Sequence, residues 1–276
     1  MGLKDLLVHV DNDPACGARL DVAAALAAKH GAHLTGLHAM GWPRLPGYVE
    51  AGLPSSFLEE ERRLLHERAR QAEACFHERA HRLGLRGEWR VDAGDLVATM
   101  KLHARYADLA VVGQGLDLKD APVDLGILPE ELTLGVGRPV LVVPRYGVFE
   151  TVGERVLIAW NGSREVTRAV HDAMPLLKVA TKVTVLSIDP AHDPEPRVPS
   201  ADIALHLARH GIAAEADWTP GLDIAVGDVL LSRAADLGAD LIVMGAYGHS
   251  RMREMVLGGA TRHMLQRMTV PVLMSH

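Results

Sequence analysis

The stretch Met244–Leu265, "MGAYGHSRMREMVLGGATRHML", decides the fold, because it joins a buried apolar run to an amphipathic segment through a glycine-containing loop. The run Leu241–Gly245 has the length of a parallel strand, and Ala260–Met268 has the periodicity of a helix. Gly258 and Gly259 stand directly before that helix, where unpaired N–H groups and the helix dipole favour an anion. The stretch therefore predicts either a cradle for phosphates or a tight strand-to-helix connection that needs small residues.

The chain contains the same unit twice. Corresponding segments of the two halves are Ala107–Gly115 with Ala239–Tyr247, and Arg138–Arg145 with Val270–His276. We predict two domains, residues 1–147 and 153–276.

Each half alternates short apolar runs with amphipathic segments, which is typical of parallel strands that helices cover on both faces. The expected strands of the second half are Val156–Trp160, Val183–Ile188, Ala214–Trp218, Leu241–Gly245 and Val270–Met274. The expected helices between them are Glu165–Val179, Ser200–His210, Ala225–Leu237 and Ala260–Met268. Ser200 is expected to cap one helix start, and Gly211 and Gly238 to follow helix ends. The pattern predicts a doubly wound α/β sheet in each half.

The composition narrows the classes of partner. The 276 residues carry a formal net charge of −6, which argues against nucleic acid or an anionic membrane as the main partner. Only two cysteines occur, so we expect no disulfide framework and no cysteine-based metal site. The first residues do not form a signal peptide, and no apolar run approaches the roughly 18 residues of a membrane span. We expect a soluble cytoplasmic protein.

The glycines Gly245, Gly248 and Gly258 form the pattern G-x2-G-x9-G between a strand and a helix, and with the repeat this resembles a tandem member of the universal stress protein family. The similarity covers both halves almost end to end. It implies two tandem five-stranded parallel sheets of strand order 3-2-1-4-5, Rossmann-like and of the adenine nucleotide alpha hydrolase type. It also implies ATP, with or without magnesium, in the crevice between strands 1 and 4, where open α/β sheets bind their ligands.

Carried over residue by residue, the resemblance assigns the nucleotide to the second half. The implied binding residues are Asn161, Ile188, Gly245, Gly248, His249, Gly258, Gly259, Ala260 and Thr261. It further implies a regulatory stress-response protein, a homodimer and a protein partner whose identity is unknown. Because tandem members resemble a fused dimer, it also implies that the final strands Val140–Val143 and Val272–Met274 pair with each other. We assign no catalytic residue and no metal ligand, because no carboxylate pair for Mg²⁺ and no general base is recognised near the crevice.

Two positions depart from the family pattern, since Asn161 stands where an aspartate is expected and Gly259 where a serine or threonine is expected. The first half departs further, because Leu116, Ile127 and Pro129 replace Gly248, Gly259 and Thr261. Proline has no N–H to donate, and the two large side chains occupy the place of a phosphate. We therefore expect the first half not to bind ATP in this way and to serve as a structural or regulatory partner.

Other interpretations remain open. The functional alternatives are a slow ATPase or nucleotidyl-transfer enzyme, and a scaffold that has lost nucleotide binding. The segment "HERAH", His77–His81, matches the zinc-protease pattern H-E-x-x-H, but no third ligand follows, and we expect both histidines on a solvated helix face. The expected buried stripe of that helix is Leu58, Leu65, Ala69, Ala72, Phe76, Ala80 and Leu83.

Overall fold

A computed structural model describes residues 2–41, 52–115, 123–188, 199–220, 224–248 and 259–276. The elements of the first half are β1 (Asp5–His9), α1 (Cys16–His30), β2 (His33–Ala39), α3 (Ser55–Arg82), β3 (Glu88–Asp92), α4 (Leu96–Ala104), β4 (Leu109–Gly113), α5 (Val123–Gly135) and β5 (Val140–Val143). Those of the second half are β6 (Arg155–Trp160), α6 (Arg164–Leu177), β7 (Lys182–Ile188), α7 (Pro199–Arg209), β8 (Ala214–Thr219), α8 (Val226–Leu237), β9 (Leu241–Gly245), α10 (Ala260–Arg267) and β10 (Val272–Ser275). The expected strands and helices of the second half are confirmed, with small differences at their ends.

The strands form one sheet, which corrects the prediction of two separate five-stranded sheets. Ten strands follow the order β3-β2-β1-β4-β5-β10-β9-β6-β7-β8, so each half keeps the order 3-2-1-4-5 when its strands are counted separately. The halves join where β5 and β10 pair antiparallel, with Val142 opposite Val272 and Val140 opposite Met274. All eight residues of these two strands are buried. Each half alone would expose unpaired backbone groups at this edge, and the pairing satisfies them.

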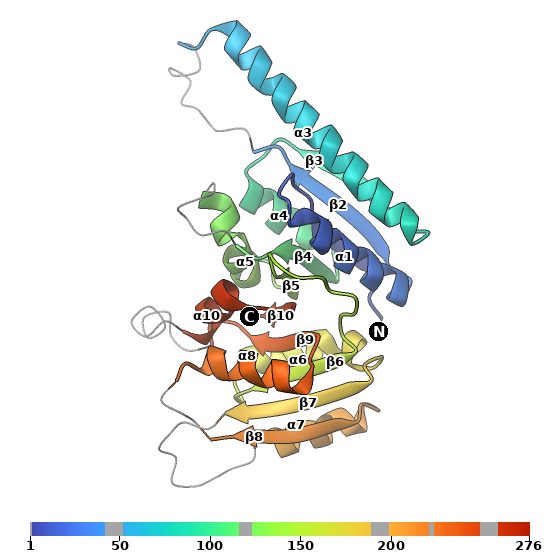
Figure 1. Ribbon diagram of the computed structural model, residues 1–276, viewed down its shortest axis with the longest axis vertical. Helices are drawn as coiled ribbons and strands as arrows, with labels where there is room; N and C mark the ends of the chain where they lie inside the picture. The colour runs from blue at the N-terminus through green and yellow to red at the C-terminus, as the bar shows by residue number, and fades with distance from the viewer. Residues whose placement is uncertain (1, 42–51, 116–122, 189–198, 221–223, 249–258) are drawn as a thin grey trace.

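Helices cover both faces of the sheet (Figure 1). Residues of α1, α3, α6 and α7 belong to one hydrophobic cluster, and residues of α4, α5, α8 and α10 belong to the other. Side chains alternate along each strand, so that Leu6 and Val8 face the first cluster and Leu7 the second. Both clusters contain residues of both halves, so the core is continuous across the junction.

Helix ends follow the sequence signals in part. Gly238 ends α8 with a left-handed φ of 58°, and Gly211 follows α7 with φ 78°. Ser200 is not the expected cap, because α7 begins at Pro199 and the Ser200 hydroxyl donates to the carbonyl oxygen of Asp217 at 3.2 Å.

Helix α3 is only half covered. Its buried residues are Ala69, Ala72, Phe76 and Ala80, whereas Leu58 and Leu65 are half-buried and Leu83 is 49% exposed. In Figure 1 the first turns of α3 extend beyond the ends of β2 and β3, so no sheet lies beneath them. The buried stripe expected from the sequence is therefore confirmed only where the sheet supports it.

His77 and His81 are exposed on α3, as expected for a solvated face. Among the residues that the structure describes, no group of three or more His, Cys, Asp and Glu side chains could hold a metal ion. The zinc-protease interpretation therefore has no support in the described part of the chain. Within the same residues, no helix has the length and apolar character that a membrane crossing requires.

Candidate functional site

Each half has a switch point of the sheet between its first and fourth strands, at whose carboxyl ends a crevice is expected. In the second half these strands are β6 and β9, which pair in parallel from Val156 opposite Leu241 onward. In the first half they are β1 and β4. At such a point the chain leaves two neighbouring strands in opposite directions, and the diverging connections leave room for a ligand.

The turn from β6 into α6 is built by its own side chains. The Asn161 Oδ1 atom accepts a hydrogen bond from the Ser163 N–H at 3.1 Å, and Ser163 Oγ accepts one from the Val166 N–H at 3.3 Å. Ser163 thereby caps α6, and Gly162 between them takes a φ of 69°. Asn161 is exposed at the crevice, with its side-chain oxygen already engaged in the turn.

Gly245 and Gly248 lie against the first turn of α6. A Cβ atom on Gly245 would collide with the Val166 backbone nitrogen and would stand 2.7 Å from the Glu165 carbonyl carbon. A Cβ on Gly248 would stand 2.7 Å from Glu165 Oε2. Gly245 is thus required by the close packing of β9 against the backbone of α6, whether or not a phosphate is bound. A Cβ on Gly248 would meet the end of the Glu165 side chain, which can move aside, so the tight-connection interpretation is favoured for Gly245.

Glu165 is a residue of this crevice that the sequence analysis missed. Its side chain is buried, with 4% of the residue exposed, and its carboxylate faces Gly248. Burial raises the pKa of Glu165, but hydrogen bonds from its own N–H, from Arg164 and from Ser163 outweigh it, so the pKa lies below the ordinary value. An acidic residue in a first helical turn looks in the sequence like an ordinary dipole partner, and only the fold turns it towards the glycines.

The start of α10 forms the other wall. Gly259 is the N-cap with φ −50° and ψ 154°, and as a glycine it provides no side-chain cap. Thr261 is buried, and its Oγ1 accepts a hydrogen bond from the Tyr247 N–H at 3.2 Å, which ties the first turn of α10 to the end of β9. Gly259 and Ala260 are half-buried.

The remaining implied residues fall in two groups. Ile188, at the end of β7, is half-buried and packs against the same hydrophobic cluster as Tyr247. His249 and Gly258 lie outside the described residues. Among the described residues, the structure brings Gly245 and Gly248 together with Glu165.

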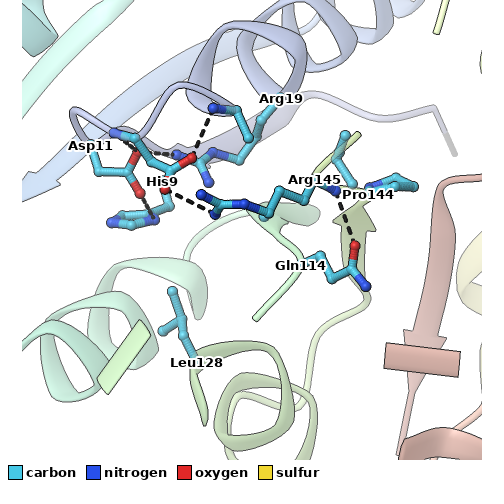
Figure 2. Close-up of a pocket in the computed structure, with 11 residues that line it drawn as sticks. His9, Asp11, Arg19, Gln114, Leu128, Pro144 and Arg145 are labelled. Atoms are coloured by element: carbon cyan, nitrogen blue, oxygen red, sulfur yellow. Dashed lines mark hydrogen bonds and ion pairs between the residues drawn. The ribbon is translucent and has the colours of Figure 1, made fainter. Parts of the chain in front are cut away.

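The crevice of the first half is filled by the chain's own charges (Figure 2). Arg19, with 4% of its surface exposed, donates from Nη2 to Asp11 Oδ1 at 2.8 Å. Arg145 Nη1 donates to Asp13 Oδ2 at 2.9 Å, and Asp13 Oδ1 accepts from the Ala15 N–H at 2.8 Å, at the start of α1. These carboxylates occupy the helix N-terminus, where an external anion would otherwise be favoured.

Little space is left beside this network. The cavity measures about 20 Å³, whereas ligand pockets usually measure roughly 300–1,000 Å³. The Arg19 guanidinium stands where a Cβ on Gly113, the counterpart of Gly245, would lie. The residues that line the cavity are His9, Asp11, Asp13, Ala15, Arg19, Gly113, Gln114, Leu128, Val143, Pro144 and Arg145. This supports the expectation that the first half does not hold a nucleotide in the manner implied for the second.

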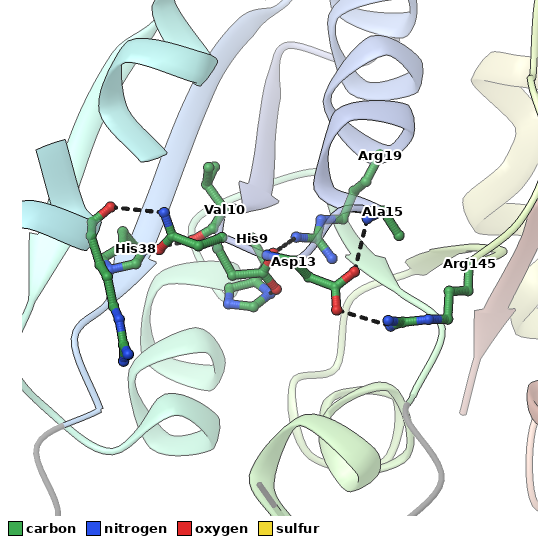
Figure 3. A network of polar contacts seen from close by, with 10 residues as sticks. His9, Val10, Asp13, Ala15, Arg19, His38 and Arg145 are labelled. Atoms are coloured by element: carbon green, nitrogen blue, oxygen red, sulfur yellow. Dashed lines mark hydrogen bonds and ion pairs between the residues drawn. The ribbon is translucent and has the colours of Figure 1, made fainter. Parts of the chain in front are cut away.

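His9 is buried beneath these charges (Figure 3). It is 3% exposed, and its Nδ1 atom lies 3.6 Å from Asp11 Oδ2. Burial above all, and then the positive charge of Arg19, lower the pKa of His9 from 6.5 to about 3, although Asp11 opposes the shift. Its neighbour His38 is held by a hydrogen bond of 2.8 Å between Nδ1 and the Val10 carbonyl. The folded protein therefore keeps His9 neutral at mildly acidic pH.

We expect this histidine to make the protein less stable in acid. Between pH 6.5 and about 3 the unfolded chain binds a proton at His9 that the folded chain does not, so the unfolding free energy falls as the pH falls. The stabilisation from neutral His9 is fully present above pH 6.5. Below that pH the free energy of unfolding falls by at most about 1.4 kcal/mol per pH unit on account of this one proton. Urea unfolding of wild type and His9→Leu at several pH values between 5 and 7 should show a shallower slope in the variant. The exposed His77→Leu should keep the wild-type slope, and equal slopes for all three proteins would contradict the prediction.

The fold and the two switch-point crevices define a doubly wound α/β protein of duplicated architecture. The model of the universal stress protein family matches residues 221–276, which contain β9, α10 and β10. A universal stress protein of Synechocystis is 23% identical over 297 residues, covering 98% of this chain and 99% of that protein.

Solved structures show the same fold. The chain resembles a universal stress protein from Archaeoglobus fulgidus with a TM-score of 0.78, 18% identity and coverage of 98% of this chain and 95% of that one. A putative universal stress protein from Pseudomonas aeruginosa gives a TM-score of 0.59, 16% identity and coverage of 99% and 93%. These comparisons support a relation to the universal stress protein family.

Proposed function

We propose that this chain is a tandem universal stress protein with domains at residues 1–147 and 153–276, and that its second domain binds ATP or a related adenine nucleotide. The nucleotide, with or without magnesium, occupies the crevice between β6 and β9. Gly259, Ala260 and Thr261 face its phosphates, together with His249 and Gly258. Asn161, Gly245 and Gly248 line the ribose, and Ile188 meets the base. The bound state is read by a protein partner, and the protein acts as a cytoplasmic homodimer in the stress response.

One observation carries this proposal. The family model matches the segment of the second half that runs from before β9 to the end of β10. That segment contains the glycine pattern and the start of α10 at Gly259, next to a switch point of the sheet. The first half carries its own ion pairs at the equivalent place, which supports the second half as the proposed binding half.

A scaffold without nucleotide binding is the second candidate, and the same crevice gives it specific support. Gly245 is explained by packing against the α6 backbone, and the Thr261 oxygen already accepts from the Tyr247 N–H. The Glu165 carboxylate adds negative charge beside Gly248, which opposes an approaching phosphate unless a cation accompanies it. The two candidates differ in what the purified protein contains.

We expect the purified protein to release ATP on denaturation, identified by chromatography, and Gly258→Val to release at least about tenfold less, because the branched side chain fills the space of a phosphate. Gly2→Val is the matched control, since a Cβ there meets nothing within 4 Å. The control should release as much ATP as the wild type.

Three results separate the candidates. Loss of ATP in Gly258→Val alone supports the proposal. Accumulation of ADP during incubation with ATP and Mg²⁺ adds slow hydrolysis. If the wild type releases no nucleotide and calorimetry detects no heat on titration with ATP, the proposal is wrong and the scaffold remains.

A further inference from the structure

A single side chain of the first half holds the far end of α10. Gln114 follows β4, and its Nε2 atom donates to the carbonyl oxygens of Leu265 at 2.9 Å and of Gln266 at 3.1 Å. These carbonyls belong to the last turn of α10, whose first turn contains Ala260 and Thr261. One short helix therefore runs from the proposed phosphate end of the second half to an amide of the first half.

Helix α10 needs this support for a physical reason. It has eight residues, and helices shorter than about 12 residues are marginal on their own. The last four carbonyls of a helix lack partners within it, and Gln114 supplies hydrogen-bond donors to two of them. Only Met264 and Thr261 of α10 are fully buried. Within the second half, α10 is tied to α8 through Asp228, whose Oδ1 atom lies 2.8 Å from His263 Nε2 and 3.7 Å from Arg267 Nη1, and Gln114 adds the support from the first half.

The Gln114 amide is itself fixed in one orientation. Its Oε1 atom accepts a hydrogen bond from the backbone N–H of Arg145 at 3.0 Å. The backbone N–H of Gln114 donates to the Val143 carbonyl oxygen at 2.8 Å. The reverse orientation of the amide would set its NH₂ group against the Arg145 N–H and its oxygen against two carbonyls. Arg145 is in turn held by Asp13, so Gln114 is joined to the ion pairs of the first-half crevice (Figure 2).

The link runs in one direction. Gly113 corresponds to Gly245, so the counterpart of Gln114 is Ala246, which has no group that could cap a helix of the first half. From this asymmetry and these contacts we infer that Gln114 is a positioning residue for the ligand site of the second half: the first half anchors α10 and thereby sets the affinity of that site. This inference rests on the proposed nucleotide binding.

The test uses the full-length protein and two substitutions at the same position. Gln114→Glu keeps the shape of the side chain but removes both donors and sets a carboxylate against two carbonyls. Gln114→Lys keeps a donor at this end of α10, where positive charge is favourable, and loses the acceptor for Arg145. Titration calorimetry with ATP should give an affinity about tenfold weaker for Gln114→Glu and within about threefold of wild type for Gln114→Lys.

A second readout separates positioning from general loss of stability. Hydrogen exchange of the α10 amides should accelerate in Gln114→Glu and not in Gln114→Lys, while the amides of α6 and α8 exchange as in wild type. Gln71→Glu on α3 is the matched control, because Gln71 is exposed and donates to Glu67 on the same helix. It should leave both the affinity and the exchange unchanged.

The outcomes are distinct. If wild type binds ATP and Gln114→Glu binds it equally well with unchanged exchange in α10, this inference is overturned and the proposed function stands. If Gln114→Lys weakens binding as much as Gln114→Glu, the donor role is wrong. If wild type binds no ATP, the proposed function fails, and with it the role of Gln114 in affinity.

Discussion

Replacement of Arg19 by methionine is expected to lower the free energy of unfolding by about 3 kcal/mol, because it leaves the half-buried Asp11 carboxylate without the charge of its buried partner. The two side chains are 5% and 17% exposed, and Arg19 Nη2 lies 2.8 Å from Asp11 Oδ1. Burial raises the pKa of Asp11, but Arg19 and then His9 outweigh it, so the pKa lies below its ordinary value and the carboxylate stays charged. Urea unfolding at pH 7 measures the loss.

Two further variants identify the cause. Arg82→Met removes an exposed arginine that lies 3.7 Å from Asp21, and it should cost less than about 1 kcal/mol. Arg19→Met combined with Asp11→Asn removes both charges and should recover much of the stability lost in the single variant. If Arg19→Met cost no more than Arg82→Met, the ion pair would not be what holds the first-half crevice together.

Gly245→Ala is expected to lower the free energy of unfolding by about 3 kcal/mol, at the upper end of the roughly 1–3 kcal/mol that overpacking costs. The new methyl group would meet the backbone of Glu165 and Val166 in the first turn of α6, and a capped helix start cannot move aside without losing its hydrogen bonds. Thermal or urea unfolding of the purified variant gives the value.

The equivalent substitution in the first half is the matched control. In Gly113→Ala the new methyl group meets the end of the Arg19 side chain, which can shift by a few tenths of an ångström, so we expect a loss of about 1 kcal/mol. Both substitutions reduce the entropy of the unfolded chain equally, and this effect cancels in the comparison. Equal losses at the two positions would show that backbone packing against α6 is not what requires Gly245.

The two halves thus use one architecture differently. In the first half, two arginines and two aspartates fill the crevice, and a buried neutral histidine lies beneath them. At the corresponding place in the second half lie Gly245, Gly248, the Glu165 carboxylate and the start of α10. The first half fills its own crevice with ion pairs and contributes the Gln114 contact to α10.

The repeat and the strands and helices of the second half could be predicted from the sequence, because they depend on local apolar periodicity, on small residues at turns and on the comparison of one half with the other. The pairing of the two final strands is expected only from the resemblance to tandem proteins. The positions of Gly245 and Gly248 beside a switch point follow from the same pattern. The sequence does not show why these positions are glycine, because a turn, a phosphate and a neighbouring helix all exclude a side chain in the same way.

The sequence by itself determined what each segment is: strand, helix or connection, repeated twice, with a crevice at the ends of the same strands in each half. Only the tertiary structure decided that the strands form one ten-stranded sheet and that Arg19 and Glu165 turn into the crevices. It alone showed that Gln114 reaches Leu265, 151 residues further along the chain. Secondary structure follows from the spacing of neighbours along the chain, whereas the direction of a charged side chain depends on groups that only folding brings within a few ångströms.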